Sequence, residues 1–140
     1  MAGANRDASR TNAAKFSYID DLTIAAGVHL YQGEMVSIRF SDDAVIASTD
    51  VAGQACLGIV TQEINNSVSG ETCKFISTAI HTMDNSESAP CYNDNIGQAC
   101  YVEDAATVSL SGDTASIVAG RIVQVNSDGV QVDYDPSVKE

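Results

Sequence analysis

Hydrophobic residues occur along this chain in short runs, and turns rich in glycine, aspartate, asparagine or serine separate them. Runs of this length, some alternating with polar residues and some continuously apolar, are typical of β-strands. The expected strands are 22–26, 28–31, 35–40, 44–47, 55–60, 71–82, 99–102, 107–110, 116–125 and 130–132. No segment shows the apolar periodicity of a helix of about four turns. The pattern predicts an all-β fold of short strands with little helix, arranged as a small barrel or sandwich.

Local side-chain chemistry predicts the turns. Asn126-Ser-Asp-Gly129 should join the last two expected strands as a hairpin, because Asp-Gly readily adopts the positive φ of a tight turn. Ser41-Asp-Asp43 should turn an earlier hairpin. Asp94 could cap one helical turn at 94–97. The polar segment 84–95 is expected to be a long exposed loop.

The order of strands and glycines indicates that one small β-unit occurs twice. The first copy comprises 33–38, 44–47 and 57–60, and the second comprises 97–102, 107–110 and 119–123. The spacing from Gly33 to Gly58 is 25 positions, and that from Gly97 to Gly120 is 23. Gly58 lies inside an apolar run, which predicts a bulge or a close backbone approach. The alternative is that short strands resemble one another by chance.

Charge divides the chain into a basic start and an acidic remainder. The length of 140 residues fits one domain, and the net charge of -12 argues against nucleic acid as a partner of the body. Residues 1–15 are polar and aperiodic and carry three basic side chains, so we expect an extended N-terminal arm there, a β-rich body at 16–134 and a frayed tail at 135–140. The arm is either a solvated start or a segment that docks on a partner.

The cysteines are expected to be reduced thiols. The first residues contain no apolar core of the kind found in secretory signals, and no apolar stretch is long enough to span a membrane. The chain has four cysteines, which are Cys56, Cys73, Cys91 and Cys100. All but Cys91 lie in apolar strand patterns, which favours a place in the core. Their spacing does not suit a zinc site, and no metal or cofactor is expected.

The residues do not suggest an enzyme. The two histidines, His29 and His81, lie outside known catalytic motifs, and the neighbouring aspartates of each Asp-Asp pair point to opposite faces of a strand. A small hydrolase would need one of these histidines beside a cysteine or serine in space. A carbohydrate-binding module would need exposed aromatic rings, and Tyr92 and Tyr134 are the candidates placed in loops.

Several short segments combine glycine, tyrosine and apolar residues in a particular order. They are Ala26-Gly-Val-His-Leu-Tyr-Gln-Gly-Glu-Met-Val36, then Gly58-Ile-Val60 with Asn65-Asn-Ser67, then Ile96-Gly-Gln-Ala-Cys-Tyr-Val-Glu-Asp104, then Thr107-Val108, Ala119-Gly-Arg-Ile-Val-Gln-Val125 and Asp128-Gly-Val130 with Val132. Together they resemble the small capsid decoration (cement) proteins of tailed bacteriophages. The resemblance covers about residues 5–132. The four cysteines and the polar insert at 85–95 depart from the family pattern.

The resemblance implies a structural protein of the virion. It implies a β-rich body on the outer surface of the capsid, made in the host cytoplasm, that commonly forms homotrimers at three-fold and quasi-three-fold positions. Such a protein clamps neighbouring subunits of the major capsid protein, and it has no enzyme activity, cofactor, nucleic-acid partner or membrane partner. The residues expected to carry much of the capsid contact are Arg6, Arg10, Lys15, Phe16 and Tyr18. The alternative function is a β-rich receptor- or carbohydrate-binding module, such as a head-fibre or spike piece.

Overall fold

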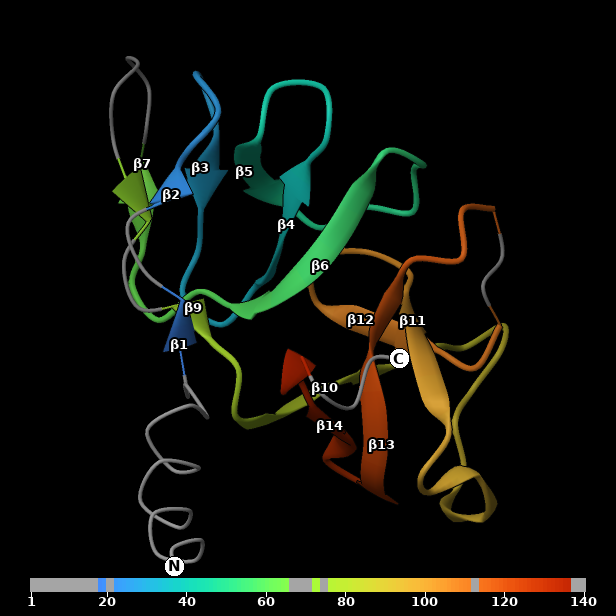
Figure 1. Ribbon diagram of the computed structural model, residues 1–140. Coiled ribbons are helices and arrows are strands. Elements are labelled where there is room, and N and C mark those ends of the chain that lie inside the picture. Colours follow the sequence, from blue (N-terminus) through green and yellow to red (C-terminus); the bar gives the residue numbers. More distant parts are fainter. Residues whose placement is uncertain (1–17, 20–21, 66–71, 74–75, 112–113, 137–140) are drawn as a thin grey trace, which may run out of the picture.

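The computed structural model describes residues 18–19, 22–65, 72–73, 76–111 and 114–136, and its architecture is all-β, as predicted (Figure 1). The strands of the first half are β1 (Tyr18–Ile19), β2 (Leu22–Thr23), β3 (His29–Leu30), β4 (Met35–Arg39), β5 (Ala44–Ala47), β6 (Gln54–Ile59), β7 (Ile64–Asn65), β8 (Thr72–Cys73) and β9 (Ile76–Ser77). Those of the second half are β10 (Ile80–Asn85), β11 (Ala99–Val102), β12 (Thr107–Ser109), β13 (Val118–Asn126) and β14 (Gly129–Asp133). A single 3₁₀ turn, η1 (Asn93–Asn95), precedes β11.

The first half is built on one curled sheet. β4 pairs antiparallel with both β5 and β6, and the full order of the sheet is β1-β9-β6-β4-β5. Just after β2, Ile24 forms a parallel bridge with Val45 of β5, and the Ala25 N–H donates to the Val45 carbonyl at 3.0 Å. β2 in turn pairs with β8. β1 lies at one end of the five-stranded sheet and Ile24 bridges β5 at the other, so the opening strands of this half contact both ends of the sheet.

The second half is a closed barrel with the order β10-β12-β11-β13-β14. β11 is the central strand and pairs antiparallel with both β12 and β13. β10 closes the barrel because it pairs parallel with β12 and antiparallel with β14. Closure leaves the barrel without a free sheet edge.

The two halves share strand order and a bulge. In each half a central strand, β4 or β11, lies between the next two strands of the chain, β5 and β6 or β12 and β13, and the register slips beside a glycine. Gly58 opposes Val36 of β4 just before the slip, and Gly120 opposes Cys100 of β11 at the same point. The structure thus confirms the predicted repeat at the level of topology.

Backbone hydrogen bonds repeat as well. The Gly33 N–H donates to the Val60 carbonyl at 2.9 Å, and the Gly97 N–H donates to the Ile122 carbonyl at 2.8 Å. The reciprocal bonds are Val60 N–H to Glu34 O and Ile122 N–H to Gln98 O, each at 3.0 Å. Gly33 and Gly97 also have nearly the same positive φ, 92° and 89°. Chance similarity of short strands would not reproduce these bonds at corresponding positions.

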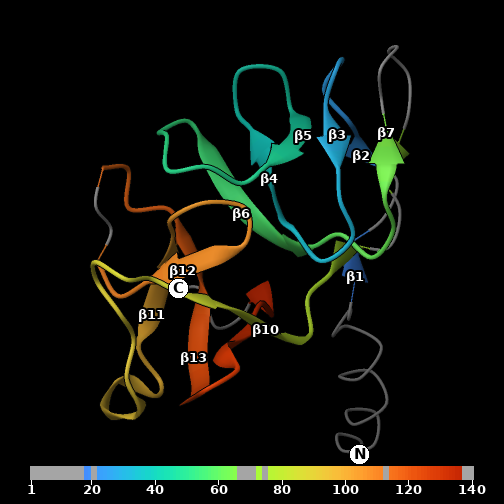
Figure 2. The same cartoon turned by 180° about the vertical axis from the view of Figure 1, so that it is seen from behind.

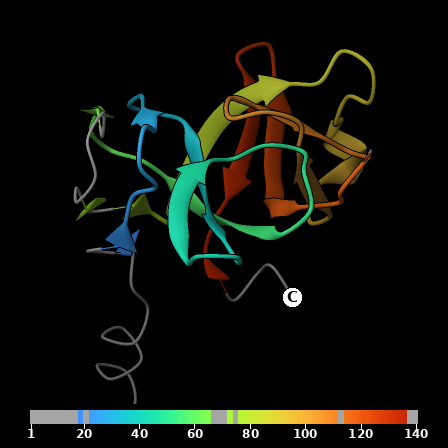
Figure 3. The ribbon, with the colours of Figure 1, turned by 90° about the horizontal axis from the view of Figure 1, so that it is seen from above.

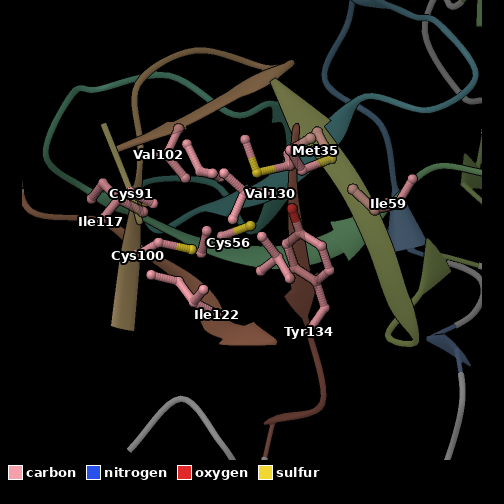
Figure 4. Close-up of a cluster of buried hydrophobic side chains, with 14 residues drawn as sticks. Met35, Cys56, Ile59, Cys91, Cys100, Val102, Ile117, Ile122, Val130 and Tyr134 are labelled. Carbon is pink, nitrogen blue, oxygen red and sulfur yellow. The ribbon is translucent and has the colours of Figure 1, made fainter. Parts of the chain in front are cut away.

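The two halves share a hydrophobic core. Met35, Cys56 and Ile59 of the first half belong to the same buried cluster as the residues that fill the barrel of the second half (Figure 4). In Figure 3 the β4–β6 sheet lies beside the strands of the second half. The Met35 N–H also donates to the Ala105 carbonyl at 2.8 Å. Each buried side chain of this size stabilises the fold by roughly 1.5–3 kcal/mol, so the halves are firmly joined.

Tyr134 lies in this shared core. Its side chain is 0 % exposed and points between Cys56 and Met35 (Figure 4). Tyr134 does lie in the loop after β14, as expected, but it is not the exposed aromatic ring that a sugar-binding site would need. Tyr134 directly follows β14 on a buried position of its alternating pattern, and a ring buried there cannot form a sugar platform.

All four cysteines are free and buried, as expected for Cys56, Cys73 and Cys100. Cys91 is buried too, although the sequence placed it in a polar loop. Burial raises the pKa of the Cys91 thiol, and burial with the neighbouring Cys91 raises the pKa of Cys100 to about 12. These thiols pack as small apolar groups.

Residues 71–82, expected as one long strand, are divided among β8, β9 and the start of β10. The Oγ atom of Ser77 accepts a hydrogen bond from the Ala79 N–H at 3.2 Å, which turns the chain after β9. This turn carries the chain from the first half into the second. This turn cannot be recognised from the sequence, because the alternating pattern continues through residues 78–80.

The polar segment 84–95, expected as an exposed loop, is partly buried. β10 runs on to Asn85, and the side chains of Ser86 and Cys91 are buried. The Asn85 amide holds the loop, since its Nδ2 donates to the Cys91 carbonyl at 3.0 Å and its Oδ1 accepts the Cys91 N–H at 2.8 Å. A polar side chain thus anchors this segment together with the buried Cys91.

The expected helical turn occurs but begins one position early. η1 starts at Asn93, and the Asn95 Oδ1 accepts the Tyr92 N–H at 2.8 Å. Asp94 is therefore inside the turn and is not its N-cap. An asparagine three residues after the N-cap residue, here Tyr92, can accept the N–H of that residue, and this interaction outweighed the preference for aspartate at the cap.

Both predicted hairpins are present. Asn126 pairs with Gly129 between β13 and β14, and Gly129 has a φ of 135°. Arg39 pairs with Ala44 between β4 and β5, and Asp43 in that turn has a φ of 55°. Among the described residues no helix has the length and apolarity needed to cross a membrane.

Candidate binding surface

The predicted arm lies almost entirely outside the described residues, including Arg6, Arg10, Lys15 and Phe16. Tyr18 begins β1, where its backbone pairs with Ser77 of β9. The β-rich body therefore includes the backbone of Tyr18. The capsid-contact role of these five residues, and the limits 16–134 and 135–140, stay predictions.

One histidine does lie beside a serine. His81 Nε2 is 2.8 Å from Ser77 Oγ at the junction between the halves. Ser77 Oγ also accepts the Ala79 N–H, and the ring of Tyr134 lies with its centroid 6.2 Å from that of His81. Within the described residues no hydrogen bond to Nδ1 of His81 supplies the third group that orients a catalytic base. The geometry fits a structural role in which His81 stabilises the turn between the two halves.

The other histidine holds an exposed aromatic ring. His29 Nε2 is 2.6 Å from the Glu63 carboxylate, which ties β3 to the segment before β7. The imidazole stacks on the ring of Tyr31, with centroids 4.1 Å apart and planes 11° from parallel. Tyr31 is 53 % exposed, so about half of it is accessible to a partner.

A polar hollow of about 540 Å³ opens on the second half, between β10 and the β13–β14 hairpin. Its lining comprises Asp84, Asn85, Glu87, Ser88, Glu103, Thr107, Asn126, Ser127, Asp128 and Gly129. The lining contains carboxylates, amides and hydroxyls but neither a basic nor an aromatic side chain. Among the described residues, no group of three or more His, Cys, Asp or Glu is arranged to hold a metal ion.

Large apolar side chains are exposed on several loops of the described chain and, at Ile80, on the first residue of β10. They are Tyr31, Phe40, Val51, Ile80, Tyr92 and Ile96. Tyr92, predicted as a loop aromatic, is 60 % exposed. Isolated exposed apolar residues are ordinary on protein surfaces, so their meaning depends on how they are held.

These loops are held by specific hydrogen bonds. The Tyr31 N–H donates to Glu34 Oε1 at 2.9 Å, and the Val125 N–H donates to Asn93 Oδ1 at 3.0 Å beside Tyr92. Near Val51, the buried amide of Gln54 bonds the loop backbone. Side chains on such fixed loops lose little entropy when they bind a partner.

Sequence reasoning missed Tyr31, Phe40 and Ile96 as surface residues. Tyr31 and Ile96 lie in apolar stretches that favour the core. The available signal was the glycine that follows each of them within two positions, at Gly33 and Gly97, because a positive φ there places a tight turn at the surface.

Comparison with known proteins assigns no function to this surface. A scan against family models, a search of curated proteins and a search of solved structures each found no match to this chain.

Proposed function

We propose that this protein is a structural capsid decoration (cement) protein that binds the outer surface of a phage head and stabilises contacts between major capsid subunits. The observation that carries the proposal is the pair of equivalently built β-units fused through one core. A rigid body with repeated features suits a partner that is itself a repeating lattice. The resemblance of the sequence motifs to cement proteins supports the same function.

The shared core supports a clamping role. A clamp must transmit force between the two subunits that it holds, and a well-packed interior transmits strain. Asp50 adds a staple between the halves, because its carboxylate accepts the N–H groups of Thr114 at 3.2 Å and Ala115 at 2.9 Å. The body can therefore act as one unit between neighbouring capsid subunits.

The basic arm and trimeric association supply affinity in this proposal. Three arms on one trimer act at high effective concentration, so modest contacts add up to stable decoration. An arm that becomes ordered only on docking loses conformational entropy, which keeps each contact weak. Arg6, Arg10 and Lys15 are the charged groups that we expect to contact the shell.

The test is co-sedimentation with expanded shells that lack the protein, using the full chain and a chain without residues 1–15. We expect saturable binding of the full chain and a large loss of binding without the arm, while thermal melting shows that the truncated body stays folded. Binding at wild-type occupancy without the arm would refute the arm's role. No binding of the full chain would refute the function.

A carbohydrate-binding module is the second candidate. The exposed ring of Tyr92 and the polar hollow favour it, since sugars stack on aromatic rings and bond to carboxylates and amides. Tyr92 does not line the hollow, so the two features do not form one described site. A glycan screen of the full protein, with Tyr92→Ala as the matched variant, distinguishes this function from decoration.

A further inference from the structure

The internal repeat allows the same face of the two halves to be compared. In the first half, Met35 of β4 pairs with Ile59 of β6, next to the pair that contains the glycine at the register slip. In the second half, Ala99 of β11 pairs with Arg121 of β13 at the corresponding point. An apolar pair in the first half and a pair with a guanidinium group in the second therefore occupy equivalent positions.

The next pair on this face lies beyond the slip. It is Ser37 with Cys56 in the first half and Tyr101 with Val118 in the second. Side chains two positions apart along β4 or β11 share a face of the sheet, so both pairs of each half lie on one face. We name this face the outer face of each half. In the second half it comprises Ala99, Tyr101, Val118 and Arg121.

Within the chain, the outer face of the first half is covered by the second half. Met35, Cys56 and Ile59 are at most 6 % exposed, and they belong to the buried cluster that fills the barrel of the second half. Ser37 on the same face is also buried. A β-unit of this build thus has an outer face that another unit of the same build covers.

The outer face of the second half stays partly exposed in the described part of the chain. Burial alternates along β11, where Cys100 and Val102 belong to the shared core and the other two residues, Ala99 and Tyr101, do not. On β13 both residues of the outer face are partly exposed as well. β11 and β13 lie side by side, on the side of the molecule away from β2 and β3 (Figures 1 and 2).

The side chains of this face are of the kinds found in contacts between proteins, since aromatic residues and arginine are enriched in the cores of such interfaces. The Arg121 Nη1 donates to the Gly97 carbonyl at 3.3 Å, which fixes this side chain near the start of β11. The chain has 19 acidic residues against 7 basic ones, so a second copy brings carboxylates to the guanidinium group. The face is less apolar than its counterpart in the first half, as expected for a contact between copies that fold separately.

We infer that the outer face of the second half binds the first half of a second copy of this chain, as the outer face of the first half binds the second half within the chain. This inference rests on the proposed function, in which copies associate, and it assigns the contact between them. The contact joins two different surfaces, so it is head-to-tail, and contacts of this kind form closed rings where the rotation between copies closes. A ring of three copies matches the homotrimer of the proposed function.

The test is sedimentation equilibrium of the full-length protein without shells, from about 1 µM to about 1 mM. We expect the mass to rise with concentration from the 14.7 kDa of one chain towards that of three. Tyr101→Ala and Arg121→Gln should each weaken the association about tenfold, because both remove a side chain of the contact. Tyr31→Ala and Arg39→Gln, the matched variants away from this face, should change it less than about twofold.

A further variant guards against misfolding. Ala99→Glu adds a carboxylate to the outer face without removing a packed side chain, and it should weaken the association at least as much as Arg121→Gln. Melting temperatures equal to that of the wild type show that each variant folds.

The outcomes separate this inference from the proposed function. A protein that stays monomeric over the whole range overturns the inference, while binding of that protein to expanded shells leaves the function standing. Association that the three outer-face variants leave unchanged, or that the matched variants weaken equally, overturns the assigned surface. Association that stops at dimers overturns the head-to-tail arrangement. Association without any binding to shells supports the contact and overturns the proposed function.

Discussion

Gly58 and Gly120 occupy the points in their halves where a neighbouring strand comes closest. A Cβ atom at Gly58 would meet the carbonyl oxygen of Ser77, and one at Gly120 would meet that of Asp133, at separations that real Cβ atoms do not adopt. In both cases the obstacle is backbone, so it cannot rotate away. Glycine is needed there because it lacks a side chain, although its φ is not positive.

Alanine at either position should therefore destabilise the protein by about 1–3 kcal/mol through overpacking. Chemical denaturation of Gly58→Ala and Gly120→Ala measures the change in the free energy of unfolding. Gly27→Asn is the matched control, because Gly27 has a φ of 79° that asparagine tolerates and open space around it. Wild-type stability of both alanine variants would contradict the close approach.

His81 makes stability depend on pH. Burial lowers the pKa of its half-buried imidazole from the ordinary value of 6.5, so the folded protein disfavours the protonated ring. The contribution of the neutral His81 imidazole to the free energy of unfolding is fully present above pH 6.5, and it is lost as the pH falls towards the lowered pKa of the folded state. We expect His81→Gln to flatten the decline in unfolding free energy between neutral and mildly acidic pH. Parallel pH profiles for the two proteins would rule out this role.

The core thiols should react slowly. Burial and the neighbouring thiol Cys91 raise the pKa of Cys100 to about 12, so little thiolate is present at neutral pH. A thiol-specific reagent should label the native protein slowly and the denatured protein rapidly at all four cysteines. Rapid stoichiometric labelling of Cys100 in the native protein would show that the shared core opens readily.

At the scale of elements, the Asn85 amide anchors the end of the loop between β10 and η1. Asn85 makes both backbone hydrogen bonds that position Cys91. Asn85→Ala leaves these backbone groups without that partner, which should destabilise the protein by about 1–3 kcal/mol and speed amide exchange at Cys91. Ser88→Ala, in the same loop, is the control. Unchanged exchange at Cys91 would mean that other contacts hold the loop.

Strands and hairpins could be predicted from the sequence wherever side-chain pattern and turn chemistry agree. The β4–β5 and β13–β14 hairpins are such cases, because Asp and Gly in the turns match the positive φ required. The break of 71–82 could not be predicted, since a single Ser77 hydrogen bond turns a chain whose alternation continues. Burial of Ser86 and Cys91 was missed because they lie in a polar segment that is anchored by a polar side chain, Asn85.

The candidate surface was predictable only in part. Tyr92 was identified because it lies in a polar segment. Tyr31 and Ile96 were missed because their apolar neighbours favour the core, and only the repeated glycine turn marks them as exposed. The contact role of the arm stays a prediction, made for Arg6, Arg10 and Lys15 from charge and for Phe16 and Tyr18 from their aromatic side chains.

At the scale of the whole molecule, the chain is a five-stranded sheet unit and a closed barrel joined by one shared core. The shared core uses side chains of both halves, and the first half has a second hydrophobic cluster of its own. Residues 1–15 carry a net positive charge and the remainder of the chain a net negative charge, so the sequence has two regions of opposite charge. In our proposal the start docks on the shell, and the paired units span neighbouring subunits.

The most direct test of the proposed decoration function is a cryo-electron microscopy reconstruction of expanded shells incubated with the full-length protein. The account predicts additional density on the outer surface at three-fold and quasi-three-fold positions, with each copy contacting two neighbouring capsid subunits. Shells without additional density at saturating protein, or density at other positions, would contradict it.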